Sequence, residues 1–201
     1  KGDGSIELWA PTQNPGTGAS QIAKLLGIPQ DKQTIHITRM GGGFGRRLAG
    51  DFMVQAAAIA KAMPGRPVQL IYSRPDDMKR DMFRPAGWHK FEAGLDASGK
   101  LIALTDHFVT FGENGKVATV AELQPTHFPA GLVPDLHYTQ SMMPTVVPMG
   151  PLRAPRSNAQ CFAFFSFLDE VAEAAGKDLP ALLLEMCGED RTIGAPVEPG
   201  K

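Results

Sequence analysis

The run Gly-Gly-Gly-Phe-Gly at residues 41–45 constrains the fold of this chain more than any other segment. Before it, residues 34–39 alternate apolar and polar side chains as a strand does. After it, apolar residues recur at helical spacing at Phe52, Ala56, Ile59 and Met63. Glycine lacks a Cβ atom, so such a run can adopt positive φ and turn its backbone amides toward one point. The sequence therefore predicts a tight turn between a strand and a helix.

Spacing alone leaves two interpretations of this turn open. It can be purely structural, because glycines in tight turns or close packing need no ligand. Alternatively, its amides can bind an oxyanion or a phosphate, helped by the helix dipole and by Arg46 or Arg47. The segment is not a Walker A loop, since the Gly-Lys-Ser/Thr ending is missing, and it is not a Gly-x-Gly-x-x-Gly fingerprint.

The remaining periodicity predicts a mixture of strands and helices. Strands are expected at residues 6–10, 68–72, 117–123 and 137–147, and as a hairpin of residues 88–95 and 101–111 turning at 96–100. One helix is expected to contain residues 22–26 and to end at the cap Gly27. Further helices are expected at residues 75–80, 158–175 and 179–187. The strand at 68–72 is predicted to be buried, and the first half of the helix at 158–175 to be buried nearly all round. The fold class is therefore α+β, or mixed α/β, with a mixed or antiparallel sheet and several packed helices.

Composition argues against several classes of function. Lys and Arg total 20 against 21 Asp and Glu, for a net charge of −1, so no nucleic-acid partner is expected. No apolar run approaches the ~20 residues of a membrane-spanning helix, so the chain is not expected to be transmembrane. Cys161 and Cys187 are too few for a disulfide framework, and the five histidines lack the spacing of a metal site.

Two polar segments stand out, at residues 9–15 and 152–160. Taken singly, the first is a proline turn and the second a helix cap with solvated arginines. Together with the glycine loop, their order and spacing resemble the molybdenum-binding large subunit of the xanthine dehydrogenase and aldehyde oxidase family, in the form found in bacterial isoquinoline 1-oxidoreductase and aldehyde dehydrogenase. Further matches extend over nearly the whole chain, at Arg66-Pro67-Val68, Asp76-Asp77-Met78, Ser98-Gly99 and Asp169-Glu170.

This resemblance implies that residues 1–190 form part of a molybdopterin-binding domain, followed by a linker or disordered tail at 191–201. It also implies a molybdenum cofactor in which the metal is held by a pterin in its cytosine dinucleotide form. This cofactor would hydroxylate a carbon next to a heteroatom with oxygen from water. Electrons would pass to [2Fe–2S] clusters on a small partner subunit, and the remainder of the large subunit would be a second partner. Because related large subunits are often exported, the periplasm is favoured over the cytoplasm.

The resemblance also assigns roles to single residues. Gln13 matches a glutamine that hydrogen-bonds the apical oxo ligand of the molybdenum, and Arg153 matches an arginine beside the cofactor. Phe44 and Gly45 match the family's loop, whose amides face the metal ligands, and Gly42, Gly43 and Arg46 are expected to bind the cofactor with them. No residue of the chain is expected to ligate the metal directly.

Departures from the family pattern narrow the expected activity. The substrate pocket would include Phe44, Leu48 and Pro155. Leu48 stands where purine-oxidising members have a glutamate, and Pro155 where they have an aromatic residue, so the substrate is expected to be an aldehyde or N-heteroaromatic compound other than a purine.

The family's catalytic glutamate, in a Gly-x-Gly-Glu motif, is absent from the chain. The chain opens at Lys1 without an initiator Met and closes on the loose residues 194–201. We therefore expect a piece of a longer enzyme that is inactive and binds no cofactor by itself. The alternative hypothesis is a stand-alone nucleotide- or phosphate-binding module that uses residues 41–45 without redox chemistry.

Overall fold

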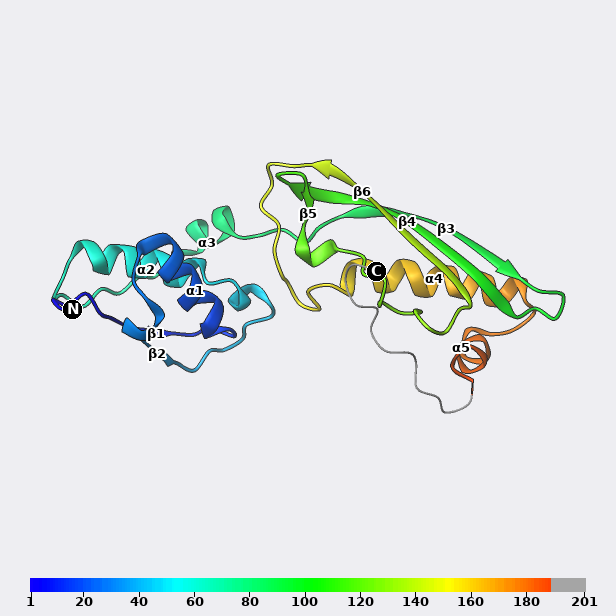
Figure 1. Cartoon of the computed structure of the whole chain (residues 1–201), viewed down its shortest axis with the longest axis horizontal. Helices are drawn as coiled ribbons and strands as arrows, with labels where there is room; N and C mark the ends of the chain where they lie inside the picture. The colour runs from blue at the N-terminus through cyan, green and yellow to red at the C-terminus, as the bar shows by residue number, and fades with distance from the viewer. Residues whose placement is uncertain (189–201) are drawn as a thin grey trace. The chain divides into compact units, whose positions relative to one another are not determined.

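The computed structural model describes residues 1–188, and the predicted tail at 191–201 lies outside them. Figure 1 shows the chain coloured from its N-terminus in blue to helix α5 in orange-red. The chain divides into two compact units. The first comprises Lys1–Arg84 with Val147–Pro155, and the second comprises Pro85–Val146 with residues 156–188. Each unit has a hydrophobic core of its own.

The first unit is built on a two-stranded parallel sheet. β1 (Ile6–Ala10) pairs with β2 (Gln33–Ile37), and α1 (Pro15–Leu26) and the 3-10 turn η1 (Gln30–Lys32) connect them. Asn14 caps α1 by accepting a hydrogen bond from Thr17 N at 3.2 Å. Gly27 ends the helix at a φ of 68°, a left-handed conformation that glycine adopts without strain. The predicted strands and the predicted glycine cap are confirmed.

The helix after the glycine loop, α2 (Asp51–Ala62), packs against α1 and β1. Its buried residues are Met53 and Ala57, whereas the predicted apolar positions Ile59 and Met63 are 41% and 43% exposed. Gly18 of α1 accounts for the difference, because a Cβ atom there would lie 2.4 Å from Met53 Sδ. The Met53 side chain fills the space that this glycine leaves, and that contact orients α2.

Residues 68–72 do not form the buried strand that their composition predicts. The structure assigns no strand to them, and Ile71 is 75% exposed. A β-prone run becomes a strand only where a neighbouring strand shares its backbone hydrogen bonds. Within residues 1–188 no strand pairs with this run, so the prediction is wrong for the described part of the chain.

The first unit is completed by α3 (Arg74–Arg80) and by the return of residues 147–155. Ser73 caps α3 by accepting a hydrogen bond from Asp76 N at 3.4 Å, in agreement with the helical turns predicted at 75–80. Beyond α3, Phe83 N donates to Pro148 O at 2.8 Å, and Gly150 N donates to Phe83 O at 3.1 Å. These bonds hold the segment that carries Arg153 in the same unit as the glycine loop.

The second unit contains a mixed sheet. β3 (Gly87–Leu95) and β4 (Leu101–Glu113) form the predicted antiparallel hairpin, whose turn is held by the Asp96 carboxylate accepting from the Ser98 and Lys100 amides. β6 (Asp135–Pro144) pairs with β4 in parallel, and the short β5 (Lys116–Val117) pairs with it antiparallel. The strand predicted at 117–123 is mostly wrong, because the 3-10 turn η3 (Thr119–Ala121) replaces it.

Two helices complete the second unit. α4 (Asn158–Ala174) runs along one face of the sheet, as Figure 1 shows, and α5 (Leu179–Cys187) packs beside it. Phe164 and Leu168 of α4 are buried in the core with β4, but Phe162 and Phe165 are 82% and 41% exposed. The predicted all-round burial of α4 is therefore wrong, because within the described residues the sheet covers only one side of the helix.

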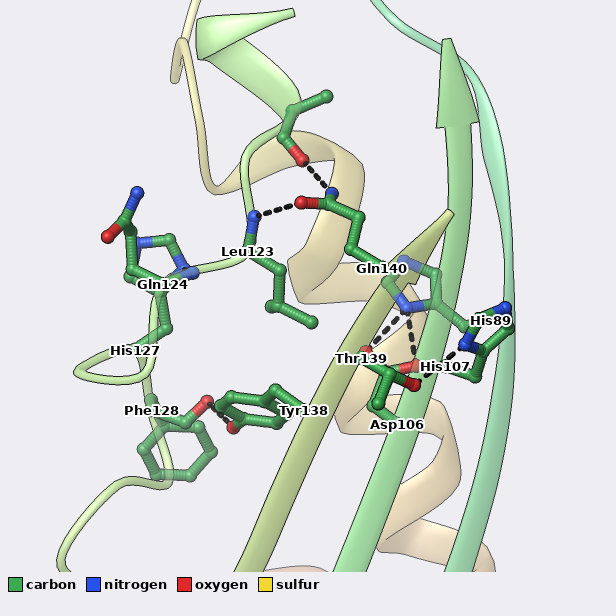
Figure 2. A network of polar contacts seen from close by, with 11 residues as sticks. His89, Asp106, His107, Leu123, Gln124, His127, Phe128, Tyr138, Thr139 and Gln140 are labelled. Atoms are coloured by element: carbon green, nitrogen blue, oxygen red, sulfur yellow. Dashed lines mark hydrogen bonds and ion pairs between the residues drawn. The ribbon is translucent and has the colours of Figure 1, made fainter. Parts of the chain in front are cut away.

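A buried polar pair lies in the core of the second unit (Figure 2). The side chains of His89 on β3 and Asp106 on β4 are 6% and 0% exposed, and His89 Nδ1 lies 2.9 and 3.1 Å from the two carboxylate oxygens. The His89 ring stacks on Phe108 with 4.1 Å between the ring centroids. Burial, and next to it the negative charge of Asp106, raises the pKa of Tyr138 above its usual value.

No helix among residues 1–188 is long and apolar enough to cross a membrane. The same residues contain no group of three or more His, Cys, Asp or Glu that could hold a metal ion. Cys161 and Cys187 are both exposed free thiols.

Candidate functional site

The turn after β1 is held against the loop that follows β2. Thr12 is only 2% exposed, and its Oγ1 donates to Arg47 O at 3.3 Å. The backbone N of Gln13 donates to the same Arg47 carbonyl oxygen at 3.0 Å. Thr12 Oγ1 also accepts from Asn14 N at 3.1 Å, so this hydroxyl joins the turn and the loop. The backbone of Gln13 is thereby fixed next to the glycine run.

The side chain of Gln13 lies on the glycine loop itself. Its Oε1 accepts a hydrogen bond from Gly45 N at 3.0 Å. A Cβ atom on Gly43 would lie 2.4 Å from that oxygen, so any other residue there would displace the amide. Among residues 1–188, no group accepts a hydrogen bond from Gln13 Nε2. The Gln13 side chain thus uses its acceptor within the protein and keeps its amide donor free.

Phe44 connects the glycine loop to the third predicted segment. Its carbonyl oxygen accepts a hydrogen bond from Arg153 N at 2.5 Å, and its side chain is 63% exposed. Phe44 has a φ of 46°, and the next residue, Gly45, has a φ of 86°. A Cβ atom on Gly45 would meet the backbone of Pro151 at 3.1 Å, so glycine permits the close approach of residues 151–153. The structure therefore brings together Gln13, the glycine loop and Arg153, which are far apart in the sequence.

Arg46 is neutralised by carboxylates. Its guanidinium donates two hydrogen bonds to Asp51, each of 2.9 Å, and also pairs with Asp81. Hydrogen bonding to Asp51 raises the pKa of Arg46. Although burial opposes ionisation of Asp51, the hydrogen bonds from Arg46 hold the pKa of that carboxyl below its usual value. The predicted role of Arg46 in cofactor binding stays a prediction, because the nitrogens of this guanidinium face acidic side chains.

The other predicted site residues surround the same loop. A Cβ atom on Gly42 would lie 2.3 Å from the Phe44 ring, so this glycine makes room for the aromatic side chain. Leu48, in the 3-10 turn η2 (Arg46–Leu48), donates from its backbone N to Gly45 O at 3.0 Å. Pro155 ends the segment of the first unit that carries Arg153. The substrate-pocket role assigned to Phe44, Leu48 and Pro155 stays a prediction.

One amide of the loop has a partner within the protein, because Gly45 N donates to Gln13 Oε1. The expectation that the loop's amides face ligands of a metal stays a prediction. Thr12 lies in the predicted proline turn but is not among the predicted site residues, although its burial and its bonds to both segments fix the turn. The only sequence signal for Thr12 is a hydroxyl residue between Pro11 and Gln13 in a turn, a position where side chains often bond the backbone.

A groove of about 1500 Å³ also opens in the first unit, along β1 and residues 64–72. Gly42, Gly43 and Phe44 line it, but Gln13 and Arg153 do not. The groove therefore borders the candidate site without containing its two most distinctive polar residues.

The Molybdopterin cofactor-binding domain family matches residues 1–183 of the chain. The chain belongs to this family. The resemblance predicted from the sequence is confirmed.

Curated relatives of this chain include the beta subunit of isoquinoline 1-oxidoreductase from Brevundimonas diminuta, 45% identical over 103 residues. A membrane-bound aldehyde dehydrogenase (pyrroloquinoline-quinone) from Gluconacetobacter polyoxogenes is 40% identical over 102 residues. Each match covers 51% of this chain and 13% of the relative. The chain thus spans a small part of the length of these proteins.

Solved structures confirm the fold of this chain. The quinoline 2-oxidoreductase of Pseudomonas putida 86 matches with a TM-score of 0.73 and 21% identity, over 90% of this chain and 24% of that one. The aldehyde oxidoreductase of Desulfovibrio gigas matches with a TM-score of 0.71 and 20% identity, over 90% and 20% of the two chains. The α+β class with a mixed sheet, as predicted, is the architecture of these domains.

Proposed function

We propose that this chain is part of the large subunit of a molybdenum hydroxylase that oxidises an aldehyde or an N-heteroaromatic compound. The observation that carries the proposal is the convergence of Gln13, the glycine loop and Arg153 in a chain of the molybdopterin-binding family. The names of the relatives, an isoquinoline 1-oxidoreductase subunit and an aldehyde dehydrogenase, support this substrate class.

The residues present fit such a cofactor in their donor chemistry. Because Gln13 Oε1 accepts from Gly45 N, the amide group is held in one orientation and its Nε2 is available to an oxygen atom of a ligand. Gly43 leaves the space in which this side chain lies, and Phe44 of the same loop is exposed. The chain's residues would therefore bind and orient the group, and they would not ligate the metal.

When bound, the molybdenum–pterin cofactor, which we propose to be the cytosine dinucleotide form, supplies the redox chemistry. That chemistry would replace a C–H bond of the substrate by a C–OH bond with oxygen from water, releasing two protons and two electrons, and the electrons would pass to [2Fe–2S] clusters. Cys161 and Cys187 are too few to hold a cluster, so we assign the clusters to a partner subunit. The base that activates the reaction would come from the remainder of the large subunit. A periplasmic location is part of the same proposal.

Purification of the full-length protein with its partner subunit tests this function. We expect about one molybdenum per large subunit and turnover of an aromatic aldehyde or isoquinoline with an artificial electron acceptor. Pyrroloquinoline quinone in place of molybdenum, as the name of one relative would suggest, would contradict the cofactor assignment. Phosphate or nucleotide binding at the glycine loop without any redox activity would favour the stand-alone module.

The 201-residue chain by itself is expected to fold but to show no turnover. The reason is that both cores lie within the chain, whereas the family's Gly-x-Gly-Glu motif does not. Circular dichroism should show a cooperative thermal transition, and an assay with aldehydes and an artificial acceptor should stay at the level of a metal-free control. Turnover clearly above that control would show that the catalytic base lies within residues 1–201.

The apolar residue Leu48 is expected to make the intact enzyme prefer aldehydes or simple heteroaromatics over xanthine. An unpaired polar edge of a purine buried there would cost about 1–3 kcal/mol per group. We therefore expect kcat/KM for an aromatic aldehyde to exceed that for xanthine by at least about tenfold, and Leu48→Glu to narrow the difference. Equal or better use of xanthine by the unmodified enzyme would refute a specificity role for Leu48.

A further inference from the structure

Arg84 braces the segment that carries Arg153. Its Nη2 donates to Arg153 O at 3.1 Å, although the two residues are distant in the sequence. On the other side of the same residue, Arg153 N donates to Phe44 O. The backbone of Arg153 is therefore held from both sides, by the glycine loop through its N–H and by Arg84 through its carbonyl. All three residues belong to the first unit.

This bracing matters because the neighbouring backbone is strained. Ala154 has a φ of 58°, in the left-handed region that residues with a Cβ atom rarely adopt. Such conformations persist only where surrounding contacts hold them. The backbone bonds between Phe83 and residues 148 and 150 fix the start of the segment. The bond from Arg84 fixes it immediately before the strained residue.

The guanidinium of Arg84 differs from that of Arg46. Arg46 is neutralised by Asp51 and Asp81, whereas no carboxylate among the described residues forms an ion pair with Arg84. The Nη1 atom of Arg84 is buried and has no hydrogen-bond partner within residues 1–188. Burying a charged donor in this way is costly, so packing alone does not explain an arginine at this position. The same guanidinium donates a hydrogen bond to the Arg153 carbonyl, so the arginine holds that backbone segment.

We infer that Arg84 is a positioning residue for the proposed reaction. It holds Arg153 and, through it, the Phe44 carbonyl in place, so that the glycine loop and Gln13 keep the geometry that the cofactor requires. This inference rests on the proposed function, since Arg153 and the loop are assigned to the cofactor there. Arg84 acts through these residues and makes no direct contact with Gln13 in this arrangement.

Three variants of the full-length enzyme test this role. Arg84→Met removes the donor but keeps an unbranched apolar chain, Arg84→Lys keeps a charged donor, and Arg80→Met removes an exposed arginine at the end of α3 as a matched control. Hydrogen exchange of peptides that cover residues 148–156 measures directly whether the backbone of Arg153 is still held in place. Steady-state kinetics per bound molybdenum measure the effect on catalysis.

For Arg84→Met we expect exchange of the Arg153 amide to accelerate at least about tenfold, while peptides from β1 and α1 keep their exchange rates. A small displacement of positioning groups can cost up to about 10²-fold, so kcat should fall about tenfold to a hundredfold with KM within about twofold. Arg84→Lys should restore most of both properties, and Arg80→Met should leave both unchanged.

The inference is overturned if Arg84→Met leaves Arg153 exchange and kcat unchanged. It is also overturned if kcat, molybdenum content and melting temperature fall together and Arg84→Lys restores none of them, because Arg84 would then serve folding only. If the unmodified protein held no molybdenum, the proposed function would fail. Independently of that result, unchanged hydrogen exchange of the Arg153 amide in Arg84→Met would show that Arg84 does not hold this segment.

Discussion

Gln13→Glu in the full-length enzyme is expected to lower kcat by about 10²–10³-fold, with little change in melting temperature. A glutamate can still accept the hydrogen bond from Gly45 N, so the contact that holds the side chain on the loop is kept. The substitution removes only the Nε2 donor and places a negative oxygen where the protein now presents an N–H. Loss of one preorganised donor to a developing charge typically costs about 2.7–4 kcal/mol, which corresponds to a fall in kcat of about 10²–10³-fold.

Two comparisons make the Gln13 result specific. Gln69→Glu, at an exposed glutamine of the same unit, should leave kcat and melting temperature unchanged, because an exposed substitution is usually within about 0.5 kcal/mol. Gly43→Ala should displace the Gln13 amide, since its Cβ would lie 2.4 Å from Oε1, and should lower kcat in the same direction. If the Gln13→Glu protein retained full kcat, or lost activity only because it unfolded, the functional role assigned to Gln13 would be wrong.

His89→Phe is expected to destabilise the second unit by about 3–5 kcal/mol. The substitution keeps an aromatic ring stacked near Phe108, but it leaves the Asp106 carboxylate buried at 0% side-chain exposure without its partner. Replacing both members of a buried pair with apolar residues is far less costly than removing one. The double variant His89→Phe/Asp106→Leu should therefore recover most of the lost stability.

The unfolding of the two units can be followed separately by tryptophan fluorescence. The chain has two tryptophans, Trp9 in β1 of the first unit and Trp88 in β3 of the second unit, next to His89. In a Trp9→Phe background, urea unfolding followed by Trp88 fluorescence reports the second unit alone. A stability loss below about 1 kcal/mol in His89→Phe, or a double variant less stable than the single one, would contradict the account of this pair.

Local sequence signals predicted most of the elements. The turn predicted at 96–100 contains Asp96 and Gly99, the predicted cap Gly27 ends α1, and the helix predicted at 179–187 begins after the capping residue Asp178. Each of these depends on the conformation or hydrogen bonds of residues close in the sequence, which composition and spacing can reveal. The order of strands and helices was sufficient for the fold class, which the solved relatives share.

Features that depend on distant partners could not be predicted. Residues 68–72 have the composition of a buried strand, but within residues 1–188 no strand edge pairs with them. The exposed side of α4 at Phe162 and the burial of Met53 over Ile59 are likewise set by which neighbour each helix meets. His89 and Asp106 are separated in the sequence and face each other only because β3 and β4 pair in one register.

The candidate site shows the same division. The resemblance brought Gln13, the glycine loop and Arg153 to attention, and the structure brings them within hydrogen-bond distance. Sequence alone could not show that Gly45 N donates to Gln13, that Arg46 is engaged by Asp51 and Asp81, or that Arg84 supports Arg153. Each of these contacts joins segments whose approach is a result of folding.

In the proposed function, Gln13 is held by the glycine loop and faces an oxygen atom of a bound molybdenum–pterin cofactor. The most direct measurement is the distance from Gln13 Nε2 to the nearest cofactor oxygen in an experimental structure of the loaded full-length protein. We predict a hydrogen-bond distance of about 2.7–3.2 Å, with Gln13 Oε1 still bonded to Gly45 N. A cofactor bound elsewhere, or one with no oxygen within about 4 Å of Nε2, would contradict the claim.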